Sequence, residues 1–243
     1  MIPSSENYWI KNAQVPACLI VSTDLKPTHQ GLCWVDLEIA RGAIAQIVPA
    51  GSSATGDTPT VDWHKGQVWP CFVDMHTHLD KGHIWDRTPN LDGTFAGAID
   101  AAKADSEQYW QARDVYRRME FGIKCSYAHG TKAIRTHIDS FGEQSAISLE
   151  AFKTLQQAWA DRVILQPVSL VSLDYYQTPE GVTLADKIAE VSGILGGVAY
   201  MNPDLDAQLD TVFNLAQERG LNLDFHTDEN GDPDSICLQK VAE

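Results

Sequence analysis

The sequence has few basic residues. Lysine and arginine together number 18, against 33 aspartates and glutamates, which leaves a formal net charge of −15 at pH 7. A surface of this charge repels the phosphates of nucleic acids and of anionic lipids. We therefore expect no nucleic acid and no membrane among the partners of this protein, and an acidic surface that aids solubility accounts for the charge.

Paired cysteines and long apolar segments are also absent. The five cysteines are odd in number, scattered and without a C-x-x-C pair, which is typical of a protein kept in a reducing compartment. The first twelve residues lack the basic start and apolar run of a signal peptide. No apolar run approaches the roughly 20 residues that span a bilayer. The sequence therefore predicts a soluble, cytoplasmic protein.

The motifs of two common α/β enzyme classes are missing as well. No G-x-G-x-x-G and no phosphate-binding P-loop follows any predicted strand, which argues against a nucleotide-binding doubly wound sheet. The absence of G-x-S-x-G disfavours a serine hydrolase.

One stretch, FVDMHTHLDKG at residues 72–82, contains two histidines one residue apart. Side chains alternate faces along a strand, so His76 and His78 at a strand end would aim both imidazole rings at one point. A divalent transition metal is the commonest reason for such a pair. Because the chain has eight histidines, one H-x-H is a weak motif by itself. His226 ends a further predicted strand and is the third candidate.

Residues 1–70 are predicted to form a first domain of β-strands. Stretches rich in apolar and β-branched residues give three strands, at 17–21, 33–39 and 42–48. Residues 49–59 form a loop by composition. This part is predicted to be one portion of a β-sandwich whose partner strands are missing.

Residues 71–243 are predicted to form a second domain in which strands and helices alternate. The five predicted strands are 72–75, 131–137, 163–171, 196–200 and 221–226. Pro167 suggests a bulge in the third strand, and Gly130 and Gly220 are predicted helix stops. Histidines at strand ends favour a barrel over a doubly wound sheet, because barrel enzymes place their chemistry there.

The predicted fold class is therefore α/β, with an N-terminal β-sandwich part followed by the first five units of a metal-dependent (β/α)8 TIM-like barrel. Eight such units take roughly 250 residues, which is more than residues 71–243 provide, so we expect three units to be missing. A complementing chain could supply them, and a homo-oligomer is possible. A non-catalytic fragment or one half of a split gene is the alternative to an active enzyme.

Four segments resemble the amidohydrolase superfamily and, within it, the cytosine deaminase family: HTHLDKG, PNLDGTFAGAI, IRTHID and LDFHTDEN. The resemblance implies an enzyme that hydrolytically deaminates cytosine or a related nitrogen heterocycle and releases ammonia. It also implies one divalent metal, zinc or iron, and a small-molecule heterocyclic substrate. Another cyclic amide or amidine is the alternative substrate.

The resemblance assigns the metal and proton-transfer roles residue by residue. His76 and His78 match the first two metal ligands, and His226 matches the ligand on the fifth strand. Glu229 matches the glutamate that moves the proton of a metal-activated water to the ring nitrogen. The alternatives are a hydrogen-bonded strand-end histidine for His226 and a solvated acid for Glu229.

Three further residues are candidates for substrate binding. Phe95 falls where the family places an apolar side chain against the substrate ring. Ser172 stands where the family has a substrate-binding glutamine, which puts cytosine itself in doubt. His137 ends the second barrel strand near the expected pocket, and a structural or supporting histidine is its alternative role.

Overall fold

The structure, a computed structural model, describes residues 2–21, 25–53 and 56–243. The chain divides into two compact units, Met1–Pro70 and Cys71–Glu243. Among the described residues, no helix combines the length and the apolar character that crossing a bilayer requires.

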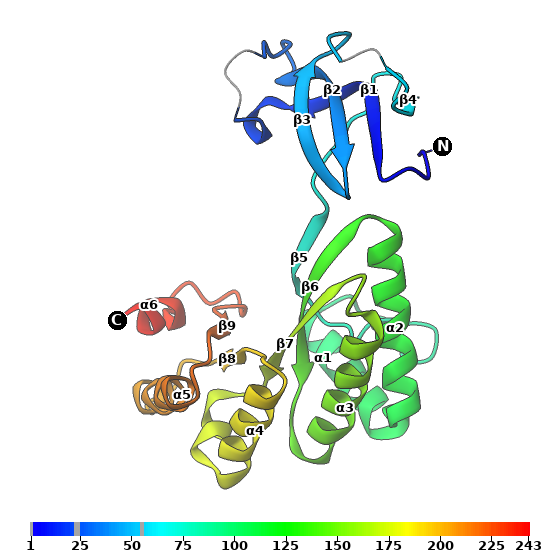
Figure 1. The fold of residues 1–243 in the computed structure, drawn as a ribbon. Coiled ribbons are helices and arrows are strands. Elements are labelled where there is room, and N and C mark those ends of the chain that lie inside the picture. The colour runs from blue at the N-terminus through cyan, green and yellow to red at the C-terminus, as the bar shows by residue number, and fades with distance from the viewer. Residues whose placement is uncertain (1, 22–24, 54–55) are drawn as a thin grey trace. The chain divides into compact units, whose positions relative to one another are not determined.

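The first unit is built on one four-stranded sheet (Figure 1). Its strands are β1 (Asn7–Pro16), β2 (Leu32–Ala40), β3 (Ala43–Pro49) and β4 (Thr60–Asp62), in the order β3-β2-β1-β4. The strand β4 runs parallel to β1, and the other neighbours are antiparallel. No second sheet faces this one within the described residues of the unit, so a complete sandwich is not present there.

The predicted strand at 17–21 is wrong. Ala17–Leu19 forms a 3-10 helix, and the first strand is instead β1, Asn7–Pro16. A β-bulge between Ile10 and Ala13 places Asn12 at a φ of 55° and breaks the alternation of apolar and polar residues. This break explains why β1 carries no clear strand signal. The predicted strands at 33–39 and 42–48 coincide with β2 and β3, and the predicted loop 49–59 includes residues 54 and 55, which lie outside the described residues.

The second unit alternates strands and helices. In chain order its elements are β5 (Phe72–Thr77), α1 (Phe95–Tyr109), α2 (Ala112–Ala128), β6 (Thr131–Asp139), α3 (Gly142–Trp159), β7 (Ile164–Leu170), η2 (Leu173–Gln177), α4 (Pro179–Glu190), β8 (Leu195–Ala199), α5 (Leu205–Arg219), β9 (Leu223–Thr227) and α6 (Cys237–Ala242). All five predicted strands of this unit are thus present.

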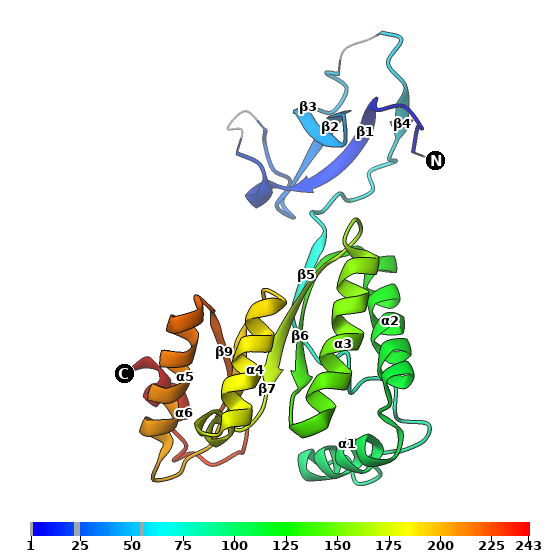
Figure 2. The ribbon, with the colours of Figure 1, turned by 60° about the horizontal axis from the view of Figure 1, so that its bottom comes forward.

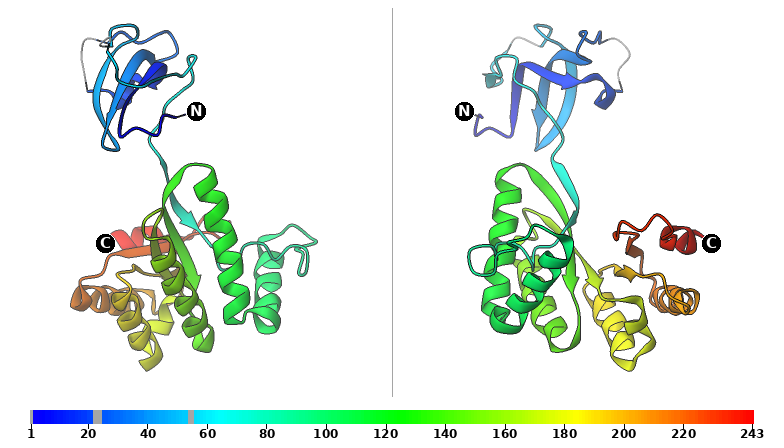
Figure 3. Two further views of the ribbon diagram at one scale, coloured as in Figure 1. Left: turned by 45° about the vertical axis from the view of Figure 1, so that its right-hand side comes forward. Right: turned by 180° about the vertical axis from the view of Figure 1, so that it is seen from behind.

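These five strands are parallel and follow one another in chain order. Continuous ladders join β5 to β6, β6 to β7, and β8 to β9. At the junction of β7 and β8, Ile194 N donates to Pro167 O at 2.9 Å and Val198 N donates to Val171 O at 2.8 Å. Figure 2 shows α2, α3, α4 and α5 ranged along one side of the strands, and Figure 3 gives the view from behind.

The buried core of this unit lies between those helices and the strands. Its fully buried members include Ile134, Ile138, Leu155, Ile188, Leu195 and Val212. The phenol of Tyr176 is also buried, bonds Ser169 Oγ at 2.8 Å and donates to Gly196 O at 2.7 Å, which strengthens the junction of β7 and β8. The bulge predicted from Pro167 is wrong, because the pairing of β6 with β7 runs without a register shift.

Candidate metal centre and adjoining cavity

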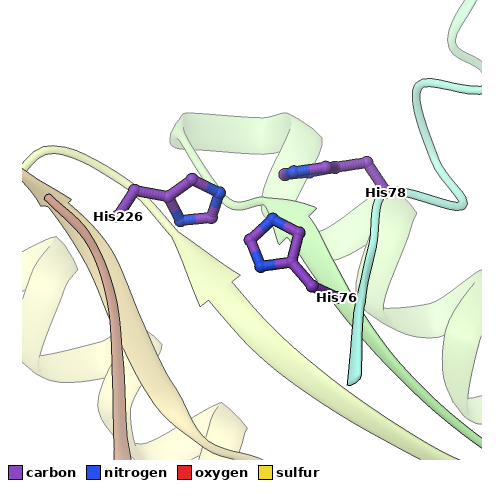
Figure 4. A group of neighbouring side chains, drawn as sticks. All are labelled: His76, His78 and His226. Carbon is purple, nitrogen blue, oxygen red and sulfur yellow. The ribbon is translucent and has the colours of Figure 1, made fainter. Parts of the chain in front are cut away.

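Three histidines converge at the carboxyl ends of two strands (Figure 4). His76 lies in β5, His78 directly follows that strand, and His226 lies in β9. One ring nitrogen from each residue lies within 4.8 Å of the nitrogens of the other two. Because β5 and β9 stand at opposite ends of the strand order, the five strands must curl to bring these rings together.

The donor set of this cluster fits a divalent metal ion. His226 is buried, yet neither of its ring nitrogens has a hydrogen-bond partner among the described residues, and Nδ1 of His78 is likewise unpaired. Buried polar atoms normally find a partner, and unpaired imidazole nitrogens aimed at one point are what a zinc or iron site requires.

Burial keeps the imidazoles of His78 and His226 neutral, which is the form that binds a metal. Loss of solvent, together with the charge of Lys81 and the neighbouring histidines, lowers the pKa of His78 to about 3. Burial also lowers the pKa of His226, and the nearby charge of Glu229 only partly opposes this shift.

His137 packs against the rings of the cluster and does not line the cavity that opens over them. Its ring is fully buried, with centroids 4.2 Å from His76 and 4.8 Å from His226. Its Nε2 lies 3.3 Å from Asp224 Oδ1, and Asp224 also pairs with Arg135 at 2.8 Å. This environment favours support of the cluster over contact with a substrate.

A cavity of about 180 Å³ opens over the three histidines. Glu229, two residues beyond β9, and Phe95, the first residue of α1, both line it. The position of Phe95 is set by the start of α1, where Thr94 Oγ1 accepts a hydrogen bond from Gly97 N at 2.9 Å and caps the helix. The structure thus brings Glu229 and Phe95 together with the three histidines.

A second cavity, of about 490 Å³, adjoins the first. The two cavities share five lining residues: Lys81, Ile99, Leu170, Val198 and Tyr200. Ser172 lines this second cavity and not the one over the histidines. Asp139 also lines it and pairs with Lys81 at a distance of 2.8 Å between Oδ1 and Nζ.

Sequence reasoning gave no role to Lys81, Tyr200 or Asp228, all of which line the cavity over the histidines. Each follows a strand by one to four residues. Position just beyond a strand's carboxyl end was the available signal, because barrel-type folds build their sites there. That signal does not separate these residues from neighbours that face solvent.

We expect acidification to destabilise the metal-free chain. Below pH 6.5 the unfolded chain binds a proton at His78, whereas the folded chain does not until about pH 3, so the free energy of unfolding falls as pH falls through this window. The lowered pKa values of His226 and His137 act in the same direction. Asp80, whose pKa burial raises to about 7, acts in the opposite direction but is one group against three.

The measurement is Tm by circular dichroism in excess chelator at several values between pH 7 and pH 5. A His78→Asn variant should show a shallower fall of Tm, because it removes one of the three titrating groups. An identical fall in the variant would contradict the assignment to His78.

Comparison with known proteins finds relatives similar to this chain. No family model matches the chain. A pterin deaminase from Rhizobium rhizogenes (strain K84 / ATCC BAA-868) is 44% identical over 241 residues, which are 99% of this chain and 55% of that protein. An N-isopropylammelide isopropyl amidohydrolase from Pseudomonas sp. (strain ADP) is 25% identical over 191 residues, which are 75% of this chain and 47% of that protein.

Solved structures of related enzymes have the same fold as this chain. The crystal structure of 5-methylcytosine deaminase from Klebsiella pneumoniae with 5-fluorocytosine superposes with a TM-score of 0.78 at 24% identity, over 96% of this chain and 54% of that one. The chain is similar in sequence and in fold to deaminases of the amidohydrolase superfamily. The resemblance of four segments to amidohydrolases is thereby confirmed.

The chain spans about half the length of the curated relatives it matches. Its α/β class agrees with that of the superfamily structures. The histidine cluster lies in the unit of alternating strands and helices. It forms at the ends of β5 and β9, which are the first and the last of the five strands in sequence.

Proposed function

We propose that this chain carries the metal site and the proton-transfer residue of an enzyme that hydrolytically deaminates a nitrogen heterocycle. The observation that carries this proposal is the convergence of three imidazoles, of which His78 and His226 have buried ring nitrogens without a hydrogen-bond partner among the described residues. His76, His78 and His226 would hold one zinc or iron ion. When bound, such an ion is a Lewis acid that lowers the pKa of a water molecule toward ~7.

Glu229 is proposed to move the proton. It lines the cavity over the histidines, so its carboxylate can take a proton from the attacking water and pass it to a ring nitrogen. The water oxygen forms a bond to the ring carbon that bears the amino group. The carbon–nitrogen bond to that group then breaks, ammonia leaves with the second water proton, and the ring keeps a carbonyl oxygen.

The apolar walls of the cavity are proposed to orient the ring. Phe95 and Ile99 from α1 and Tyr200 beyond β8 offer flat or apolar surfaces against which a heterocycle can pack. The wall they form also excludes water from the ring face, so that the attacking water comes from the side of the histidines.

Two features favour a fused two-ring substrate of the pterin type over cytosine. The first is the 44% identity with a pterin deaminase. The second is the larger cavity that continues from the first, where Ser172 presents a short side chain and the Lys81–Asp139 pair offers a donor beside an acceptor. Cytosine, which the sequence suggested first, is the second candidate.

The five parallel strands are proposed to be the first five of an eight-unit barrel. As an end strand of the five, β5 exposes Phe72, Val73 and Met75, each more than half accessible. Exposed apolar edges of this kind are normally covered. Further strand–helix units, from the same polypeptide or a complementing chain, would cover them, and the N-terminal sheet would be part of a β-sandwich.

The test is ammonia release from pterin, cytosine and 5-methylcytosine by the protein as its cell makes it. We expect pterin to be turned over at an ordinary enzymatic rate of about 1–10³ s⁻¹. Activity should vanish after treatment with a chelator and return on addition of zinc or iron. Failure to release ammonia from any of the three rings by fully metal-loaded protein would refute the proposal.

A further inference from the structure

The residue that separates the metal-site strand from the proposed proton carrier has an unusual backbone. Asp228 follows β9 directly and has a φ of 59°, in the left-handed region that residues other than glycine rarely adopt. Aspartate is one of the few side chains that tolerate this region. The chain therefore makes a sharp turn between His226 and Glu229.

The carboxylate of Asp228 holds this turn in place through three hydrogen bonds. Its Oδ1 accepts from Ser235 Oγ at 2.6 Å and from Cys237 N at 2.8 Å, and its Oδ2 accepts from Leu238 N at 2.9 Å. Cys237 is buried and begins α6, so the turn is tied to a fixed point of the fold.

Glu229 has no comparable anchor of its own. Across residues 56–243 no side-chain hydrogen bond fixes its carboxylate, although Glu229 and His226 line the same cavity. Its placement therefore depends on the backbone of the preceding residue.

We propose that Asp228 is a positioning residue, which fixes the turn that presents Glu229 to the cavity over the three histidines. This inference rests on the proposed proton transfer by Glu229. It predicts that loss of the three hydrogen bonds harms catalysis through Glu229 alone and leaves the metal site intact.

Two substitutions separate the backbone from the carboxylate. Asp228→Gly adopts a φ of 59° without strain but removes all three bonds. Asp228→Asn keeps an acceptor for Ser235 and Cys237 and tolerates the left-handed region. We expect Asp228→Gly to lower kcat roughly 10- to 100-fold, because displacements of about 1 Å cost this much. KM and bound metal should be unchanged, and Asp228→Asn should recover most of the rate.

Asp232→Gly is the matched control. Asp232 lies in the same loop and is exposed, and within the described residues its carboxylate accepts only from Asp234 N nearby. Its kcat should equal that of the unmodified protein. A loss of kcat in this control as large as in Asp228→Gly would overturn the inference, because general loosening of the loop would then explain both.

A double-mutant cycle with Glu229→Gln decides whether Asp228 acts through Glu229. If it does, adding Asp228→Gly to Glu229→Gln costs less than about twofold, since the carboxylate to be positioned is already gone. If the losses in kcat of the two single variants instead multiply in the double variant, or if Asp228→Gly loses metal, the inference is overturned. The proposed function would still stand. If Glu229→Gln alone keeps full activity, the proposed proton transfer fails, and the inference fails with it.

Discussion

The affinity for zinc is expected to fall by about 100-fold or more when His226 is replaced by alanine. Structural zinc sites with four ligands gain about 10–16 kcal/mol on binding, or roughly 3 kcal/mol per ligand, and about 1.4 kcal/mol corresponds to tenfold. His226 is the only one of the three that comes from β9, so the variant leaves just the two histidines of the β5 end. The measurement is competition for Zn²⁺ with a chromophoric chelator.

The matched control is His29→Ala. His29 is an exposed histidine of the first unit and takes no part in the cluster. Its substitution should leave the affinity unchanged. Equal affinity in His226→Ala and the unmodified chain would remove His226 from the metal site.

Turnover is expected to fall roughly 10²- to 10⁴-fold in Glu229→Gln, the usual contribution of a general acid–base residue. The amide keeps the size of the side chain but cannot accept and return a proton at neutral pH. Metal content should be unchanged, because Glu229 is not among the three converging ligands. Steady-state ammonia release and metal analysis of the same preparation give the two readouts.

Glu190→Gln serves as the control for this experiment. Glu190 is exposed at the end of α4 and lines neither cavity. It should retain full turnover. Undiminished turnover in Glu229→Gln would show that another group carries the proton.

The sequence was most informative about features that depend on residues close together in the chain. His76 and His78 are one residue apart at the end of a strand, so the pattern itself predicted that they act together. The partnership of His226 with them followed from a second rule, that parallel strands end at the same edge. The strands β5 to β9 were recognisable because each is apolar and bounded by turn residues.

The sequence was least informative about residues whose role depends on their surroundings in the folded structure. Nothing in the chain around His137 shows that its ring is fully buried and bonded to Asp224, 87 residues away. Ser172 was placed at the pocket, but only the structure separates the cavity over the histidines from the one beside it. The strand β1 was missed because a bulge at Asn12 interrupts its alternation.

The distance in sequence between the three histidines determines when each becomes available to a metal during synthesis. About 150 residues lie between His78 and His226, so at roughly 5–20 residues per second the third histidine leaves the ribosome about 8 to 30 s after the second. Until then the emerging chain offers a metal only two of the three imidazoles. An ion captured at full affinity therefore arrives after β9 has been made. At the proposed site, an ion would therefore join the ends of β5 and β9 only after both strands have been made.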